Sequence, residues 1–167
     1  MENKYAYLMV DYDTPQFIKD IHSQIKDEEL FKDGADSGLE LQTHVTIAPC
    51  IENNTPLDAL KKHLLPLKYY TILLNNISSF NNDLFDVLKC DVQCDFLHQT
   101  NSNIIKTFPT FSEYKEYHPH LTIAYLNKGV CQRFENNILT PLVILKPKCF
   151  NYSFYDENGE MKNIRFI

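Results

Sequence analysis

Apolar and polar residues alternate over several stretches of this chain, a pattern typical of β-strands that bury one face. The alternation predicts strands over 5–12, 39–51, 69–80, 84–91, 121–126, 142–145, 149–155 and 161–167. Polar turns at 81–83 and 156–159 separate two pairs of these strands, so we expect two antiparallel hairpins.

Three other stretches place an apolar residue at every third or fourth position, which predicts helices over 15–26, 56–66 and 96–108. The first two begin at Thr14-Pro15 and Thr55-Pro56. At each we expect threonine to be the N-cap and proline the first helical residue.

Two long loops separate these elements. The first, over 27–37, is acidic and contains glycine, with a helical turn expected at 28–32. The second, over 109–119, is aromatic and bounded by prolines. A short helix is expected around 130–138.

A tripeptide of the form His-x-Thr occurs twice, as His44-Val45-Thr46 and as His120-Leu121-Thr122. Each half of the chain reads as a strand, a helix and then a His-x-Thr strand. This weak duplication favours an α+β protein with a pseudo-two-fold axis. Because strand side chains alternate between faces, the histidine and threonine of each copy project from the same side of a sheet.

These four side chains suit a phosphodiester. If the two halves pack around one cleft, His44 and His120 exchange protons near neutral pH, while Thr46 and Thr122 donate hydrogen bonds to an anion. This chemistry requires no metal or cofactor. An alternative interpretation joins His118 to His120 as a metal-binding arm, but no further ligands are suitably spaced and a proline separates the two.

Composition limits the class of protein. With 167 residues, 44% hydrophobic and 23% charged, the chain has the size and balance of one globular domain over 1–167. No apolar stretch approaches the roughly 20 residues of a membrane-spanning helix, and we see no signal peptide. We therefore expect a cytoplasmic protein.

Charge and cysteines refine this expectation. A net charge of −6 disfavours binding to a long nucleic acid, which needs clustered Lys and Arg, but permits a small nucleotide in a local pocket. The five cysteines are odd in number and form no Cys-x-x-Cys pair. We expect them to be reduced packing residues.

The motifs and their flanks resemble the two-histidine (2H) phosphoesterase superfamily, particularly its small phage and viral members. The resemblance covers most of the chain and rests on Asp-Glu-Glu-Leu-Phe at 27–31, Gly-Leu-Glu-Leu-Gln-Thr-His-Val-Thr-Ile at 38–47 and Glu-Tyr-His-Pro-His-Leu-Thr-Ile-Ala-Tyr at 116–125. It implies a bilobed LigT-like fold, in which two antiparallel sheets form a central cleft with helices outside. It also implies that His44 and His120 are catalytic and that Thr46 and Thr122 hold the phosphate.

The implied activity is that of a metal-independent phosphodiesterase, without a cofactor, acting on a cyclic oligonucleotide or a short oligonucleotide. The viral character of the flanks suggests an anti-CBASS role, in which the enzyme destroys a cyclic nucleotide signal in the host cytoplasm. Two alternatives stay open: an RNA phosphodiesterase acting on 2′,3′-cyclic ends or 2′,5′ linkages, and a non-catalytic nucleotide-binding module. We expect a monomer that binds a small nucleotide or an RNA end and no membrane.

Aromatic residues near the motifs are candidates for stacking on a nucleobase, since the chain has ten tyrosines and eleven phenylalanines. Tyr12 resembles in placement a ligand-binding tyrosine of the anti-CBASS enzymes. Tyr125 is expected to face away from His120, into the core. The other substrate-binding candidates are Phe111, Tyr114 and Tyr117 in the loop before the second motif, and Lys32 in the acidic loop.

Overall fold

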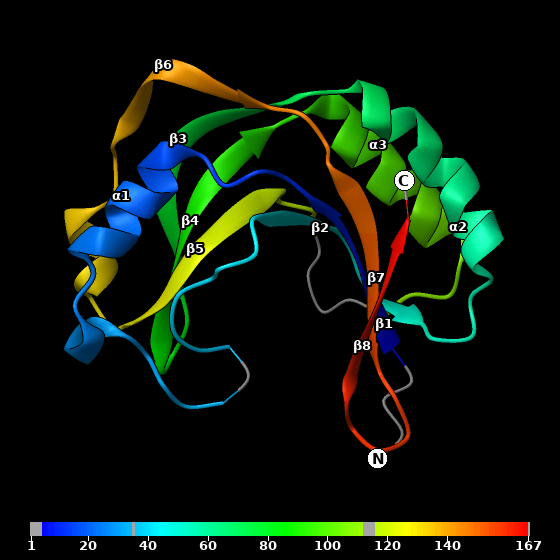
Figure 1. The fold of residues 1–167 in the computed structure, drawn as a ribbon, viewed down its shortest axis with the longest axis horizontal. Coiled ribbons are helices and arrows are strands. Elements are labelled where there is room, and N and C mark those ends of the chain that lie inside the picture. Colours follow the sequence, from blue (N-terminus) through cyan, green and yellow to red (C-terminus); the bar gives the residue numbers. More distant parts are fainter. Residues whose placement is uncertain (1–4, 35, 112–115, 167) are drawn as a thin grey trace.

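The computed structural model describes residues 5–34, 36–111 and 116–166 (Figure 1). In these ranges the chain forms two four-stranded antiparallel sheets. The first has the order β2 (His44–Glu52), β1 (Tyr5–Asp11), β7 (Cys149–Tyr155), β8 (Met161–Phe166). The second has the order β5 (His120–Asn127), β4 (Phe85–Gln93), β3 (Ile72–Asn81), β6 (Ile138–Leu145).

The two sheets form the limbs of an arch, and the helices lie on its outer side (Figure 1). The α-helices of the described ranges are α1 (Gln16–Gln24), α2 (Leu57–Leu64) and α3 (Asp95–Thr107). Short 3₁₀ helices lie at Asp27–Glu29, Leu65–Tyr69 and Val130–Arg133. Within the described part of the chain, no helix combines the length and apolar character needed to cross a membrane.

The arrangement confirms the predicted α+β class and its pseudo-symmetry. Each His-x-Thr strand is the edge strand of its sheet. Its neighbour in the sheet is the strand that precedes it in the chain, with one α-helix between the two: β1, α1, β2 in the first half and β4, α3, β5 in the second. The two motif strands, β2 and β5, contact each other, so the sheets meet where the motifs are. The fold therefore brings together two tripeptides that are far apart in the sequence.

Each half of the chain supplies a helix to the other half's sheet. Helix α1 contacts β5, and His22 Nε2 lies 2.9 Å from the carbonyl oxygen of Ile123. Helix α3 contacts β2, and Asn101 Nδ2 donates to the carbonyl oxygen of Ile47 at 2.8 Å. The buried apolar residues of both sheets consequently form one continuous cluster, which includes Val45 and Leu121.

The threonine caps expected at the first two helices are absent. Pro15 and Pro56 themselves occupy the N-cap positions with extended backbone, and neither helix has a side-chain cap. Thr14 Oγ1 instead lies 2.8 Å from Thr43 Oγ1, next to the first motif strand. Because Pro15 is the N-cap, Thr14 lies one residue before the capping position, and its hydroxyl contacts Thr43 instead.

Several strand boundaries also differ from the predictions. The first motif strand starts at residue 44 instead of 39, because Leu39 bridges Ala124 on the opposite sheet. Strand β6 is longer than expected and starts at Ile138. Strand β3 starts at Ile72, since a 3₁₀ turn takes up the residues before it. The turn expected at 28–32 forms at 27–29.

Candidate active site

Both motif strands contain the same irregularity. Across β1 and β2, Met9 pairs with Thr46 but Leu8 pairs with Ala48, so Ile47 is an extra residue. Across β4 and β5, Lys89 pairs with Thr122 but Leu88 pairs with Ala124, so Ile123 is the extra one. Such an insertion is a β-bulge, which redirects the strand beyond it. Each motif is therefore followed by a bulge at the equivalent position.

Side chains from helices α3 and α1 donate hydrogen bonds to the two bulges. The carbonyl group of Ile47 accepts the Asn101 amide, and that of Ile123 accepts both the His22 ring and the backbone N–H of Glu40. A carbonyl oxygen can only accept, so Nε2 of His22 carries the hydrogen. These bonds satisfy backbone groups that a bulge leaves without a ladder partner.

The two motif histidines are anchored in the same way. His44 Nδ1 lies 2.8 Å from the carbonyl oxygen of Gln42, and His120 Nδ1 lies 2.7 Å from that of His118. Because a carbonyl only accepts, Nδ1 of each ring is the donor. Nε2 is then the nitrogen of each ring that can accept a proton when neutral and donate one when charged.

His120 lies in a partly desolvated, positively biased environment. Its ring meets the Phe80 ring edge to face, with centroids 4.9 Å apart. Burial lowers its pKa from the usual value near 6.5, and the charges of Lys89 and His44 lower it further, against the opposing effects of the His118 carbonyl and Asp91. His44 is one of the groups whose charge acts on His120, so the two imidazoles lie within electrostatic range of each other.

A carboxylate stands opposite each histidine on the neighbouring strand. Asp11 pairs with His44, and Asp91 pairs with His120. Asp91 accepts hydrogen bonds from Asn76 and Ser78 and forms an ion pair with Lys89. These aspartates and Lys89 are site residues that sequence reasoning missed. The available signal was a charged residue inside an apolar strand, which is costly to bury without a function or a partner.

Tyr125 corrects one sequence-based expectation. We expected its side chain to point away from His120, but the bulge at Ile123 shifts the alternation by one residue. Tyr125 pairs with Val87, and Thr122 pairs with Lys89, so both lie on the His120 face. The Tyr125 hydroxyl contacts Thr122, and burial, Asp36 and Glu40 raise its pKa to about 12. Tyr125 is thus a neighbour of the second motif.

The acidic loop, together with the residues that lead from it to the first motif, runs along the second motif strand. Phe31 and Glu40 donate backbone hydrogen bonds to the carbonyl oxygens of Tyr125 and Ile123, each at 3.0 Å. Tyr125 donates in turn to the carbonyl of Gly38, whose φ of +75° suits glycine. The loop therefore extends the edge of the second sheet and places Asp36 near both Tyr125 and Tyr7.

The predicted substrate-binding residues occupy different environments. Tyr12 is only 4% exposed and belongs to the core, so its ring is not presented for stacking. Phe111 is 53% exposed and stacks on Tyr5 with centroids 6.0 Å apart. Lys32 is exposed and forms an ion pair with Asp27 of its own loop. Tyr114 lies outside the described residues.

Tyr117 contacts the first motif. It is half-buried, packs against the core, and donates its hydroxyl hydrogen to the carbonyl oxygen of Thr46 at 2.9 Å. Its ring also meets His98 edge to face. In this position Tyr117 holds the first motif strand in place.

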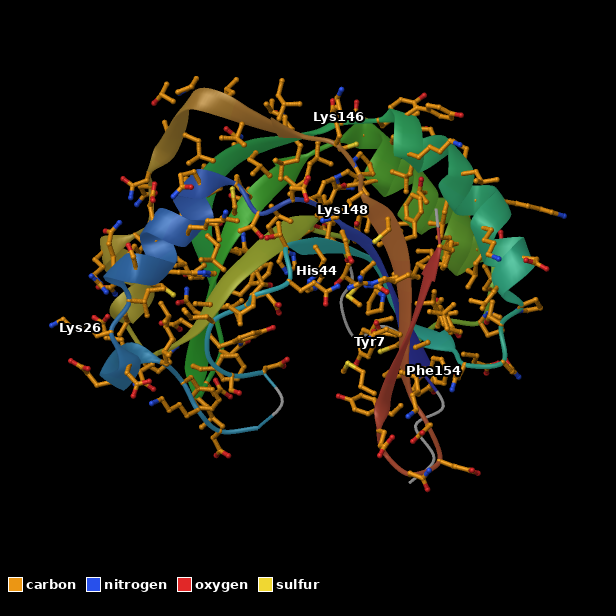
Figure 2. The ribbon with its side chains drawn as sticks, viewed as in Figure 1. Tyr7, Lys26, His44, Lys146, Lys148 and Phe154 are labelled. Carbon is orange, nitrogen blue, oxygen red and sulfur yellow. The ribbon has the colours of Figure 1, made fainter. Side chains whose placement is uncertain are left out.

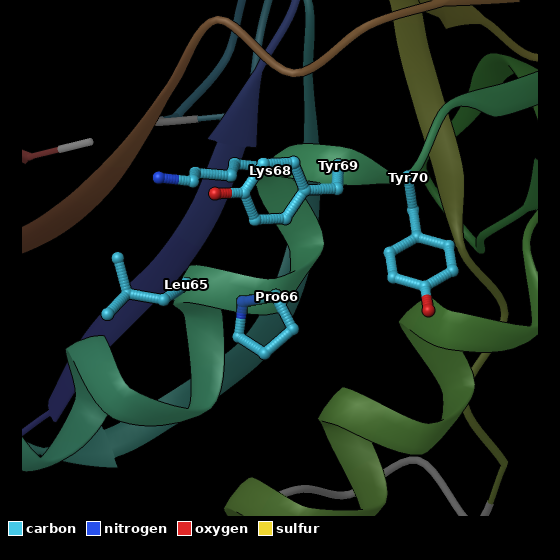
Figure 3. Close-up of a pocket in the computed structure, with 5 residues that line it drawn as sticks. All are labelled: Leu65, Pro66, Lys68, Tyr69 and Tyr70. Atoms are coloured by element: carbon cyan, nitrogen blue, oxygen red, sulfur yellow. The ribbon is translucent and has the colours of Figure 1, made fainter.

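The inner side of the arch carries His44 and Tyr7, as Figure 2 shows. A separate hollow of about 470 Å³ is lined by Leu65, Pro66, Lys68, Tyr69 and Tyr70 (Figure 3), and none of the motif residues takes part in it. Among the described residues, no group of three or more His, Cys, Asp or Glu side chains is placed to hold a metal ion. His118 Nε2 lies 3.6 Å from Glu116 Oε2.

Comparison with known proteins identifies the fold. No family model matches the chain, and no curated protein sequence matches it. Among solved structures, E. coli LigT complexed with 3′-AMP has a TM-score of 0.58 at 15% identity, covering 99% of this chain and 97% of LigT. A structure described as a phosphoesterase has a TM-score of 0.51 at 16% identity, covering 98% and 96%. The chain thus has a LigT-like fold over almost its whole length.

Proposed function

We propose that this protein is a phosphodiesterase of the 2H type, working by acid–base catalysis between His44 and His120 without a metal. One observation carries the proposal. Both rings are anchored through Nδ1 to the carbonyl two residues earlier, on edge strands that contact each other, which leaves the equivalent nitrogen Nε2 of each ring for proton transfer. Two imidazoles on opposite sides of a phosphodiester are sufficient for its cleavage.

The chemistry uses one ring in each protonation state. A neutral Nε2 removes a proton from the attacking oxygen, either water or a ribose 2′-hydroxyl. A bond forms between that oxygen and phosphorus, and the bond to the leaving oxygen breaks as the other, protonated Nε2 donates its hydrogen. Thr46 and Thr122 donate to the non-bridging oxygens, which gain charge in the transition state.

A nucleotide is the substrate class that the surroundings favour. LigT was crystallised with 3′-AMP, and the shared fold covers 99% of this chain. Tyr5 and Phe111 are stacked and exposed at the end of β1 opposite Asp11 and His44, so they offer a stacking surface, worth about 1–3 kcal/mol per base, to a ligand that extends along the strand. Asp36 and Glu40, near Tyr125, repel additional phosphates. We therefore infer a small ligand, a cyclic nucleotide or short oligonucleotide, with a counter-immune role as the biological proposal.

An RNA-end activity is the second candidate. A 3′-monophosphate such as the 3′-AMP bound to LigT carries its phosphate on the ribose 3′-oxygen. Opening a 2′,3′-cyclic phosphate, or cleaving a 2′,5′ linkage, needs the same two proton transfers. Only the contacts around the bases and riboses distinguish this activity from cleavage of a cyclic dinucleotide.

A substrate panel with and without EDTA tests the proposal. Cyclic di- and trinucleotides, 2′,5′-oligoadenylate and 2′,3′-cyclic-ended RNA are incubated with the wild-type protein, His44→Ala, His120→Ala and the control His118→Ala. We expect turnover of at least one compound, unaffected by EDTA and retained in His118→Ala, with losses of roughly 10²–10⁴-fold in the two motif variants. Tight binding without turnover would indicate a binding module instead, and inhibition by EDTA would contradict the metal-free mechanism.

A further inference from the structure

The pseudo-two-fold arrangement allows equivalent positions of the two motifs to be compared. Opposite each histidine stands an aspartate, Asp11 or Asp91. Opposite each threonine the residues differ: Met9 faces Thr46, whereas Lys89 faces Thr122. The two halves of an otherwise matched site therefore carry different charge.

On the side of the second motif, the aspartate is neutralised. Lys89 is 6% exposed, forms an ion pair with Asp91 and donates to Ser78 Oγ at 2.6 Å. Its Nζ also lies 4.5 Å from the centre of the Phe80 ring, the same ring that meets His120 edge to face. A buried ammonium this near to His120 disfavours a second positive charge on the imidazole.

On the side of the first motif, the aspartate has only neutral hydrogen-bond partners among the described residues, and the cations Lys148 and Arg165 act on one of these partners, Cys149, without an ion pair to Asp11 being present in the described ranges. Asp11 is 6% exposed and accepts hydrogen bonds from Gln42 Nε2 at 2.9 Å, Asn151 Nδ2 at 3.0 Å and Cys149 Sγ at 3.4 Å. A second carboxylate, that of Glu40, accepts the backbone N–H of Gln42 at 2.9 Å. The backbone segment whose carbonyl anchors His44 thus lies between two carboxylates.

We propose that this difference fixes the direction of catalysis, with Lys89 biasing His120 to act as the base while His44 acts as the acid. His120 Nε2 takes the proton of the attacking oxygen, and His44 Nε2 gives its proton to the leaving oxygen as the bond to phosphorus breaks. Lys89 acts through His120 and is therefore a positioning residue. The inference rests on the proposed phosphodiesterase function and assigns its two proton transfers.

The charged and titratable groups facing His120 agree with this direction. From β4 these are Lys89 and Asp91, and from β2 His44. Burial has the largest effect and lowers the pKa of His120; the His118 carbonyl opposes it, and Lys89 contributes to the lowering more than Asp91 offsets it. The neutral ring is the form that a general base requires.

An NMR titration of the His120 imidazole in the ligand-free protein tests the charge arrangement without any substrate. The His120 signal is assigned by its loss in His120→Gln. We expect Lys89→Met to raise the titration midpoint of His120 and Asp91→Asn to lower it. Lys89→Arg should keep the wild-type midpoint, and Met9→Lys, the matched control on the other sheet, should not raise it. An unchanged or lowered midpoint in Lys89→Met, or a raised one in Asp91→Asn, would overturn the proposal.

A pair of substrates that differ only in the leaving group tests the assignment of acid and base. The probes are diadenosine 3′,5′-monophosphate and adenosine 3′-(4-nitrophenyl phosphate), whose nitrophenolate leaves without protonation. We expect His44→Ala to lose about 10²–10⁴-fold on the dinucleotide and far less on the nitrophenyl ester, and His120→Ala to lose activity equally on both. The opposite pattern would reverse the roles. If the wild-type protein cleaves neither of the two probes and no compound of the panel, the proposed function fails. The NMR titration still decides the effect of Lys89 on His120 in that case.

Discussion

The hydroxyl of Tyr117 donates a hydrogen bond to the backbone carbonyl oxygen of Thr46, at 2.9 Å. The two residues are 71 positions apart, and Tyr117 comes just before the second motif while Thr46 belongs to the first. The loop that leads into one motif is therefore tied to the strand of the other. This bond couples the positions of the two sheets where the motif strands β2 and β5 contact each other.

Replacing Tyr117 by phenylalanine should weaken this coupling. The variant keeps the ring in the core but leaves the Thr46 carbonyl without its donor, so we expect a loss of about 0.5–1.5 kcal/mol in the free energy of unfolding. Denaturant unfolding measures it, and Tyr69→Phe, an exposed position, is the control. We also expect kcat to fall; a stability loss with unaltered kcat would show that the bond has no role in the site.

Asn101→Ala should destabilise the protein, because it removes the hydrogen bond from helix α3 to the bulge in β2. Asn101 is 7% exposed, and its amide is the partner of the Ile47 carbonyl at the bulge. Leaving that buried carbonyl without a donor costs about 1–3 kcal/mol. Thermal or denaturant unfolding measures the effect against Asn103→Ala, an exposed asparagine in the same helix. Equal stability of the two variants would contradict this role of Asn101.

The lowered pKa of His120 predicts a pH-dependent contribution to stability. In the unfolded chain the ring takes up a proton at about pH 6.5, but in the folded protein it does so only at lower pH. Between these values the unfolded state binds more protons, so folding stability rises with pH. The stability of the wild type relative to His120→Gln should therefore fall as the pH is lowered through this window. Urea unfolding at several pH values measures it, and a constant difference would contradict the prediction.

Tyr125→Phe tests the corrected position of that side chain. The variant removes the hydroxyl that contacts Thr122 but keeps the ring beside the acidic loop. We expect a several-fold decrease in kcat/KM on a substrate cleaved by the wild type, because the Thr122 hydroxyl loses a neighbour that orients it, with little change in stability. Tyr70→Phe, far from the motifs in the sequence and stacked on Phe96, is the matched control. Equal kinetics for both variants would separate Tyr125 from the site.

Much of the framework could be predicted from the sequence because it depends on local periodicity. The strands carrying Val45 and Leu121 alternate regularly, and both residues are fully buried as the pattern implies. The hairpin of β7 and β8 forms over its predicted residues. The same alternation predicted which side of each strand carries the motif histidine and threonine, and the register of both strands agrees.

The predictions that failed are those in which a distant contact replaces a local one. Thr14 resembles an N-cap, but its hydroxyl meets that of Thr43, the residue before the motif strand. Leu39 fits the alternation of the first motif strand, yet it bridges Ala124 in the other sheet. Tyr125 lies on the opposite face from the one expected, because strand alternation holds only until a bulge inserts a residue.

By itself, the sequence determined the two His-x-Thr strands, the α+β class and the chemistry that two imidazoles and two hydroxyls can perform. These follow from residue type and from spacing along one strand, which short-range geometry fixes. Only the tertiary structure decided which groups surround each imidazole: Asp11 beside His44, and Lys89 with Asp91 beside His120. The reason is that cross-strand register and the pairing of buried charges are set by contacts between segments distant in the chain, which no local pattern specifies.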